Sequence, residues 1–168
     1  MRSSDRRSRQ RLSPQARMDA ILAAATAAFT AGTYDQVSVG AVATAAGASD
    51  ALVYKYFESK AGLYLAVVRD HLERLADHQR RLTADLAPNT SARDQVRVSV
   101  EAVLDHVEDV GVAWASPFFT GAAEPAGAQD LRSSYRADLV AGLTAQLRNP
   151  EERRAQLAIV GFLGFLGA

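Results

Sequence analysis

Apolar residues recur along this chain at helical spacing, and short polar or glycine-containing breaks separate the repeats. The first repeat lies between Ser13-Pro14, a favoured helix start, and Gly32, which we expect at the C′ position just beyond the helix end. Its apolar positions are three and four residues apart and so share one helix face. They are Met18, Ile21, Leu22, Ala25 and Phe29.

Two shorter repeats follow and predict a helix-turn-helix. The first short helix begins after Ser38 and ends at Gly47, and the second covers residues 50–56 with Ser49 as its N-cap. The joining turn is three residues long and contains a glycine, which sets two helices at roughly 90–120°. In such a unit the second helix presents its N-terminal residues to base edges. Small or branched residues suit the faces that meet, here Val42, Ala43, Ala46 and Val53.

The pattern stays helical to the end of the sequence. A long helix begins after Ser59 and closes before Pro88, and a valine-rich helix covers residues 96–110. Residues 111–127 predict a broken helix and a loop. Leucines and Tyr135 then repeat every fourth residue from 131 to 147, which predicts a helix that Asn149-Pro150 ends, and residues 151–168 predict a last helix. No segment shows the alternation of apolar and polar residues that is typical of a β-strand. We expect an all-α protein with a disordered basic arm (1–12), a three-helix DNA-binding domain (13–58) and a helical bundle for ligand binding and dimerisation (59–168).

Charge supports this division. The formal net charge of the chain is zero, yet residues 1–60 hold eight basic and five acidic side chains, a balance of +3. The remaining residues hold eleven basic and fourteen acidic side chains, a balance of −3. Such asymmetry favours a polyanion, here double-stranded DNA, as the partner of the N-terminal part.

One stretch resembles the signature of the tetracycline-repressor (TetR) family, bacterial transcriptional regulators that contain both a DNA-binding and a ligand-binding part. The resemblance is specific over residues 18–68, and the remainder is similar only in its helices. The matching pattern is Ala43-x-x-Ala46-Gly47-Ala48-Ser49-x-x-x-Val53-Tyr54-Lys55-Tyr56-Phe57-x-Ser59-Lys60-x-x-Leu63.

The resemblance implies two sets of DNA-contacting residues. Those implied to cap the DNA-binding helices or touch phosphate are Ser38, Ser49, Tyr54, Tyr56 and Lys60. Those implied to lie where bases are recognised are Asp50, Ala51, Leu52 and Lys55. Hydroxyl and ammonium groups also suit phosphate oxygens on general grounds, although Tyr54 as a packing residue is the alternative.

Two positions depart from the family pattern. Gly40 stands where a charged residue is common. Asp50 is an acid near the floor of the groove, where it repels phosphate but can accept a hydrogen bond from a cytosine amine. These departures leave the operator sequence open.

The bundle offers candidates for an effector site, because cavities in helical proteins form between facing helices. An apolar or aromatic small molecule would suit these side chains, and the alternative is that they only fill the core. The candidate ligand-binding residues are Leu104, His106, Val107, Trp114, Phe118, Phe119, Tyr135 and Leu139.

The apolar run of residues 157–168 predicts a homodimer through the C-terminal helices. A helix that is apolar on all sides must be buried on all sides, and a symmetric partner supplies the cover. Twelve residues are too few for a membrane span, so we expect no membrane association. The resemblance implies one further helix after this run, which would leave the dimer interface incomplete within this chain.

Other chemistry is not indicated. The chain has no cysteine, and His71, His78 and His106 show no metal-ligand spacing. No catalytic or nucleotide-binding motif and no signal peptide is present, so we expect a cytoplasmic protein that is not an enzyme, without metal or cofactor. The favoured hypothesis is a sequence-specific regulator, a repressor that a ligand releases from a palindromic operator. The alternatives are a ligand-blind DNA-binding or architectural protein, and a ligand-binding protein or enzyme with an incidental helix-turn-helix.

Overall fold

The computed structural model describes residues 13–111, 124–145 and 161. This part of the chain is helical without strands, which confirms the all-α prediction. Several predicted features lie outside the described residues: the arm, most of the segment 111–127 and the end of the leucine-repeat helix. The last predicted helix also lies outside them, except for Gly161, which is helical. The helices are α1 (Pro14–Ala31), α2 (Val39–Ala45), α3 (Asp50–Phe57), α4 (Lys60–Ala84), α5 (Ala92–Val110) and α7 (Ala126–Ala145).

Serine residues begin the first four helices, as the sequence predicts. The Oγ atom of each accepts a hydrogen bond from the backbone N–H three residues later, at 2.9–3.3 Å. This bond satisfies one of the N–H groups that the first turn of a helix leaves without a partner. The capping serines are Ser13, Ser38, Ser49 and Ser59.

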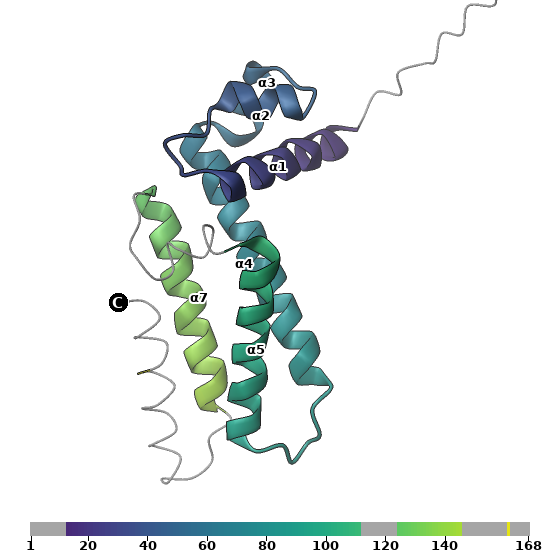
Figure 1. Ribbon diagram of the computed structural model, residues 1–168, viewed down its shortest axis with the longest axis vertical. Coiled ribbons are helices and arrows are strands. Elements are labelled where there is room, and N and C mark those ends of the chain that lie inside the picture. The colour runs from purple at the N-terminus through teal and green to yellow at the C-terminus, as the bar shows by residue number, and fades with distance from the viewer. Residues whose placement is uncertain (1–12, 112–123, 146–160, 162–168) are drawn as a thin grey trace, which may run out of the picture.

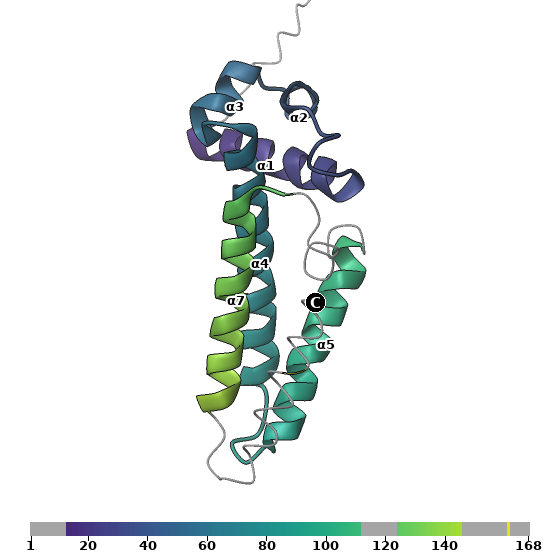
Figure 2. The same cartoon turned by 90° about the vertical axis from the view of Figure 1, so that its left-hand side faces the viewer.

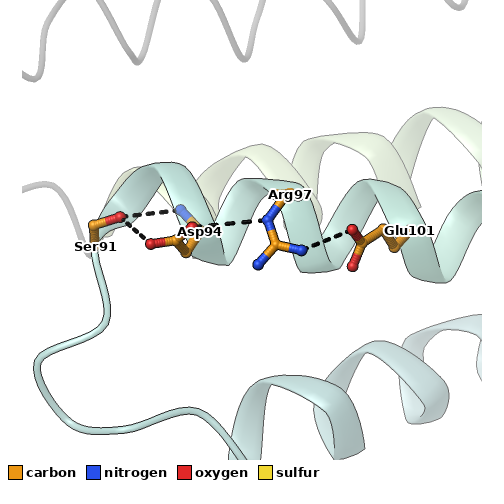
Figure 3. A network of polar contacts seen from close by, with 4 residues as sticks. All are labelled: Ser91, Asp94, Arg97 and Glu101. Carbon is orange, nitrogen blue, oxygen red and sulfur yellow. Dashed lines mark hydrogen bonds and ion pairs between the residues drawn. The ribbon is translucent and has the colours of Figure 1, made fainter.

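A fifth capping serine, Ser91, begins α5 and is an addition to those predicted from the sequence. The hydroxyl of Ser91 accepts from the N–H of Asp94 and donates to its carboxylate at 2.7 Å. Along the same exposed face Arg97 pairs with Asp94 at 3.7 Å and with Glu101 at 2.8 Å (Figure 3). Such exposed pairs contribute only a few tenths of a kcal/mol each. This ladder marks a solvent-facing side of α5.

The two predicted glycine stops differ in the structure. Gly47 has a φ of 62°, and the N–H groups of Gly47 and Ala48 donate to the carbonyls of Thr44 and Ala43. This is a Schellman motif, whose C′ residue favours glycine because of its left-handed backbone. Gly32 ends α1 differently: it is the C-cap itself, with an extended backbone at φ −150°. The expectation that Gly32 is a C′ residue is therefore wrong, although the helix does end there.

Helix α4 connects two parts of the molecule. α1, α2 and α3 gather around its N-terminal turns to form the head, and α5 and α7 lie along the rest of it to form the body (Figure 1; Figure 2). One continuous apolar core runs from the head into the body, past the boundary after Glu58 that the sequence suggests. It includes Ile21 and Phe29 of α1, Val42 of α2, Val53 of α3, Leu63, Val67 and Val68 of α4, and Ala128 of α7.

Candidate nucleic-acid interface

Close packing between α2 and α3 makes the helix-turn-helix. Val42, Ala43 and Val53 are each 1% exposed, and Ala46 is half-buried. Small and β-branched side chains at these positions let the two short helices approach closely. The Schellman turn at Gly47 and the Ser49 cap then fix where α3 begins.

Because Val53 is buried, the opposite face of α3 is turned outward. Asp50, Ala51 and Lys55 are exposed, and Tyr54 is 47% exposed. A tyrosine with half its surface in solvent, beside a lysine, is a candidate for contact with a phosphate backbone.

Two of the predicted contact residues on α3 lie partly inside the head. Leu52 and Tyr56 are half-buried, and both pack against the apolar core. The ring of Tyr56 lies 6.5 Å from that of Phe57. These two residues therefore serve packing as well as any contact with DNA.

Ser38 and Ser49 both remain exposed at helix starts. Each Oγ accepts a backbone N–H, and a hydroxyl keeps one proton to donate elsewhere. A phosphate oxygen is a suitable acceptor for that proton.

Lys60 is placed differently from the other predicted phosphate contacts. Its Nζ atom donates to the backbone carbonyl of Asp35 at 3.3 Å and lies 4.6 Å from the centre of the Tyr34 ring. The ammonium group thus holds the connection between α1 and α2 against the start of α4. In this conformation Lys60 organises the head, and a phosphate would have to compete with these contacts.

An aromatic cluster lies directly beneath Lys60. The ring of Tyr64 packs edge-on against Phe29 at 4.9 Å and against Tyr34 at 5.2 Å. Aromatic rings prefer this edge-to-face geometry because of their quadrupoles. The cluster joins α1, the α1–α2 connection and α4.

A buried ion pair continues from this cluster into the body. The Tyr64 hydroxyl donates to Glu124 Oε2 at 2.9 Å, and Arg132 of α7 pairs with the same oxygen at 3.2 Å. The side chains of Arg132 and Glu124 are only 3% and 2% exposed. Burial, together with the neighbouring Glu124 carboxylate, raises the pKa of Tyr64 to about 12, so the hydroxyl remains a donor.

Further along α4 the interior of the body is polar. The rings of His71 and His106 meet edge-to-face at 5.5 Å between α4 and α5. Gln79 donates to the carbonyl of Ser99 at 3.2 Å and accepts from the Tyr135 hydroxyl at 2.6 Å, which ties α4 to α5 and α7. Burial lowers the pKa of His71 to about 4 and also lowers that of His106.

The predicted ligand-binding residues are only partly brought together. His106, Val107, Tyr135 and Leu139 are half-buried in the body. Leu104 lies apart and is 56% exposed. Side chains at positions i and i+2 of a helix point about 200° apart, so Leu104 faces away from the buried Ala102. Trp114, Phe118 and Phe119 lie outside the described residues.

The polar interior was not predicted, apart from His106 and Tyr135. Gln79, Ser99, Glu124 and Arg132 are polar residues whose sequence neighbours give no sign that they are buried. A signal existed at His71, which falls on the apolar stripe of α4.

In the described part of the chain, no three histidine or acidic side chains are arranged to hold a metal ion. Within the same ranges, no helix combines the length and the apolar composition that crossing a bilayer requires.

Comparison with known proteins agrees with this geometry. Residues 21–67, which run from the middle of α1 to the first turns of α4, match the family described as bacterial regulatory proteins, tetR family. The HTH-type transcriptional activator FasR of Mycolicibacterium smegmatis is 30% identical over 156 residues, which cover 91% of this chain and 70% of that protein. An uncharacterized HTH-type transcriptional regulator of Mycobacterium tuberculosis is also 30% identical, over 78% of this chain and 61% of its own length.

Solved structures show the same fold. A TetR-like transcriptional regulator from Rhodococcus sp. RHA1 superposes with a TM-score of 0.69 at 22% identity, over 92% of this chain and 81% of that one. The fatty acid degradation regulator FadR from Bacillus halodurans superposes with a TM-score of 0.65 at 19% identity, over 92% and 82%. With its helix-turn-helix head and its relatives among transcriptional regulators, this chain belongs to the tetR family of bacterial DNA-binding regulators.

Proposed function

We propose that this regulator is a cytoplasmic homodimer that binds a palindromic operator and leaves it when a small apolar or aromatic molecule enters the body. The observation that carries the proposal is the outward face of α3, where Asp50, Ala51, Tyr54 and Lys55 are exposed around a buried Val53. Two such helices, related by two-fold symmetry, would enter successive major grooves about 34–36 Å apart.

Helix α4 provides the physical link between effector and DNA. Its first two turns hold the head through Lys60 and the ring of Tyr64, and its middle contributes His71 and Gln79 to the polar interior of the body. A ligand that displaces α4 in the body would therefore tilt the head. Because the two α3 helices must match the spacing of the grooves, a small tilt would weaken binding to DNA.

The effector site is proposed between α4, α5 and α7, near His106, Val107, Tyr135 and Leu139. The half-buried state of these residues and the hydrogen-bonding groups beside them support this location, since ligand sites combine apolar walls with a few polar groups. Native mass spectrometry of the full chain purified from its own cells tests it. A retained small molecule, absent from the denatured protein, would support the proposal, whereas protein that leaves its operator in extract without any small molecule bound would contradict it.

A gel-shift experiment tests DNA binding. Labelled DNA from the region upstream of the coding sequence is titrated with full-length protein at low salt. We expect a retarded band that unlabelled upstream DNA removes and an equal mass of unrelated DNA does not. Absence of any retarded band with dimeric protein would refute the proposal.

The direction of control needs its own assay, since the relative from Mycolicibacterium smegmatis is named an activator. Transcription in vitro from the upstream promoter, with and without the protein, distinguishes the two. Repression predicts less transcript when the protein is added, and more transcript would identify an activator.

A further inference from the structure

An acidic side chain lies at the beginning of the outward face of α3. Asp50 is the first residue of the helix and is exposed. No described cation lies within ion-pairing distance of its carboxylate. An unneutralised carboxylate on a surface that meets DNA repels phosphate, so it weakens binding unless it gains a hydrogen bond there.

The residue opposite Asp50 on α2 is a glycine. A methyl group placed on Gly40 would lie 3.4 Å from one carboxylate oxygen of Asp50 and 3.8 Å from the other. Any longer side chain at position 40 would lie against this carboxylate, and a basic one would neutralise it. Gly40 therefore leaves the carboxylate uncovered, between the start of α2 and the start of α3.

The chemistry of the major groove then restricts what the carboxylate can meet. Guanine N7 and O6, adenine N7 and thymine O4 are all acceptors and repel it. Adenine N6 is a donor, but the acceptor N7 beside it repels a carboxylate. Cytosine N4 is a donor from which a carboxylate can accept a hydrogen bond. N-terminal residues of a recognition helix are those that reach base edges.

We propose that Asp50 is a specificity-determining residue that accepts a hydrogen bond from the N4 amine of a cytosine in each half-site, and that Gly40 keeps its carboxylate free to do so. This inference rests on the proposed function, because it names one base that the DNA-binding surface selects. The rest of α3 and the phosphate contacts would set the overall affinity.

Selection of bound sequences from a pool of randomised duplex DNA tests this proposal. Full-length wild-type protein should enrich a two-fold symmetric site with a C·G pair at one position of each half-site, preferred about fivefold to tenfold over the other pairs. Asp50→Ala should enrich the same site with no preference at that position. Asp50→Asn should shift the preference to A·T, since an amide pairs with adenine N6 and N7.

Two further variants make the test specific. Ser38→Ala removes a phosphate contact and should weaken binding to every sequence about equally, with an unchanged preferred site. Gly40→Arg places a guanidinium beside the carboxylate and should reduce the preference for cytosine at the same position. Circular dichroism confirms that each variant is folded; Asp50→Asn is isosteric at an exposed site and should fold as the wild type does.

The outcomes separate this inference from the proposed function. If wild-type protein enriches no sequence, the proposed function fails. If it enriches a site and both Asp50 variants enrich the same site with the same preferences, Asp50 reads no base and the inference is overturned. If Gly40→Arg keeps the full cytosine preference, the role given to Gly40 is overturned.

Discussion

At the scale of single residues, position on a helix decides which side chains are available. Tyr54 and Val53 are neighbours in sequence, yet Tyr54 is 47% exposed and Val53 is 1% exposed, because each helical residue turns by about 100°. The exposed hydroxyl of Tyr54 is free to donate to a phosphate, which carries no information about sequence.

Tyr54→Phe tests this assignment. The variant keeps the ring and loses the hydroxyl, so we expect each protomer to lose about 1 kcal/mol of binding free energy, which makes about 2 kcal/mol for the dimer, roughly thirtyfold in affinity. Fluorescence anisotropy with the operator and with several single-base variants of it measures the effect. A loss confined to one sequence would show that the hydroxyl contacts a base instead.

His71 makes stability depend on pH. Burial lowers its pKa from 6.5 to about 4, and the neighbouring His106 acts in the same direction. Between pH 6.5 and about pH 4, His71 is protonated in the unfolded chain but stays neutral in the folded chain. The free energy of unfolding therefore decreases as the pH falls through this range, by up to about 3 kcal/mol. Above pH 6.5 this group leaves stability unchanged.

Urea denaturation between pH 7 and pH 4 measures this dependence. His71→Leu and His71→Gln cannot take up the proton, and both should show a flatter pH dependence than the wild type. A slope equal to that of the wild type in both variants would contradict the assignment, because other groups would then account for the whole effect.

At the scale of helices, local signals in the sequence predict the starts of the first four helices, although the Ser91 cap of α5 was missed and Gly32 is a C-cap and not a C′ residue. Serine caps and glycine stops act through neighbouring backbone groups, so the starts of α1, α2, α3 and α4 and the Gly47 turn are predictable from a few residues. Contacts between segments that are distant in sequence were not predictable in this way. Nothing near Arg132 in the sequence indicates that it pairs with Glu124 in the interior, and the exposure of Leu104 depends on which face α4 and α7 cover.

Gly62 lies where the end of α3 closely approaches the first turn of α4. A methyl group at this position would overlap the carbonyl oxygen of Phe57, which is backbone and cannot rotate away. Gly62→Ala should therefore destabilise the head, by about 2 kcal/mol or more, although alanine is the better helix former. Gly142→Ala in α7 is the matched control: its methyl meets open space, and we expect a gain of up to about 1 kcal/mol.

Thermal denaturation of the two glycine variants measures the difference. The melting temperature should fall for Gly62→Ala and rise slightly, or stay unchanged, for Gly142→Ala. Equal small gains in both would show that the start of α4 has room for a side chain.

At the scale of the whole molecule, an apolar core runs through head and body, and Tyr64 of that core donates to a buried Glu124–Arg132 ion pair in the body. Arg132→Met would leave the Glu124 carboxylate buried without its cation, which costs about 3–5 kcal/mol. Combining it with Glu124→Leu removes the unpaired charge and should restore most of that stability. Chemical denaturation of both single variants and of the double variant tests this, and a loss in the double variant equal to the sum of the two single losses would show that the pair is not coupled.

Charge is also arranged on this scale, since a net charge of zero combines a +3 N-terminal segment with a −3 remainder. The arrangement favours docking with the head toward the duplex and the acidic body away from it.

Hydroxyl-radical footprinting of the full-length protein on its upstream DNA is the direct test of DNA binding by the head. We predict two protected patches on one face of the duplex, centred about one helical turn apart and related by two-fold symmetry. Uniform protection along the fragment, or none at protein concentrations that saturate the gel shift, would contradict it.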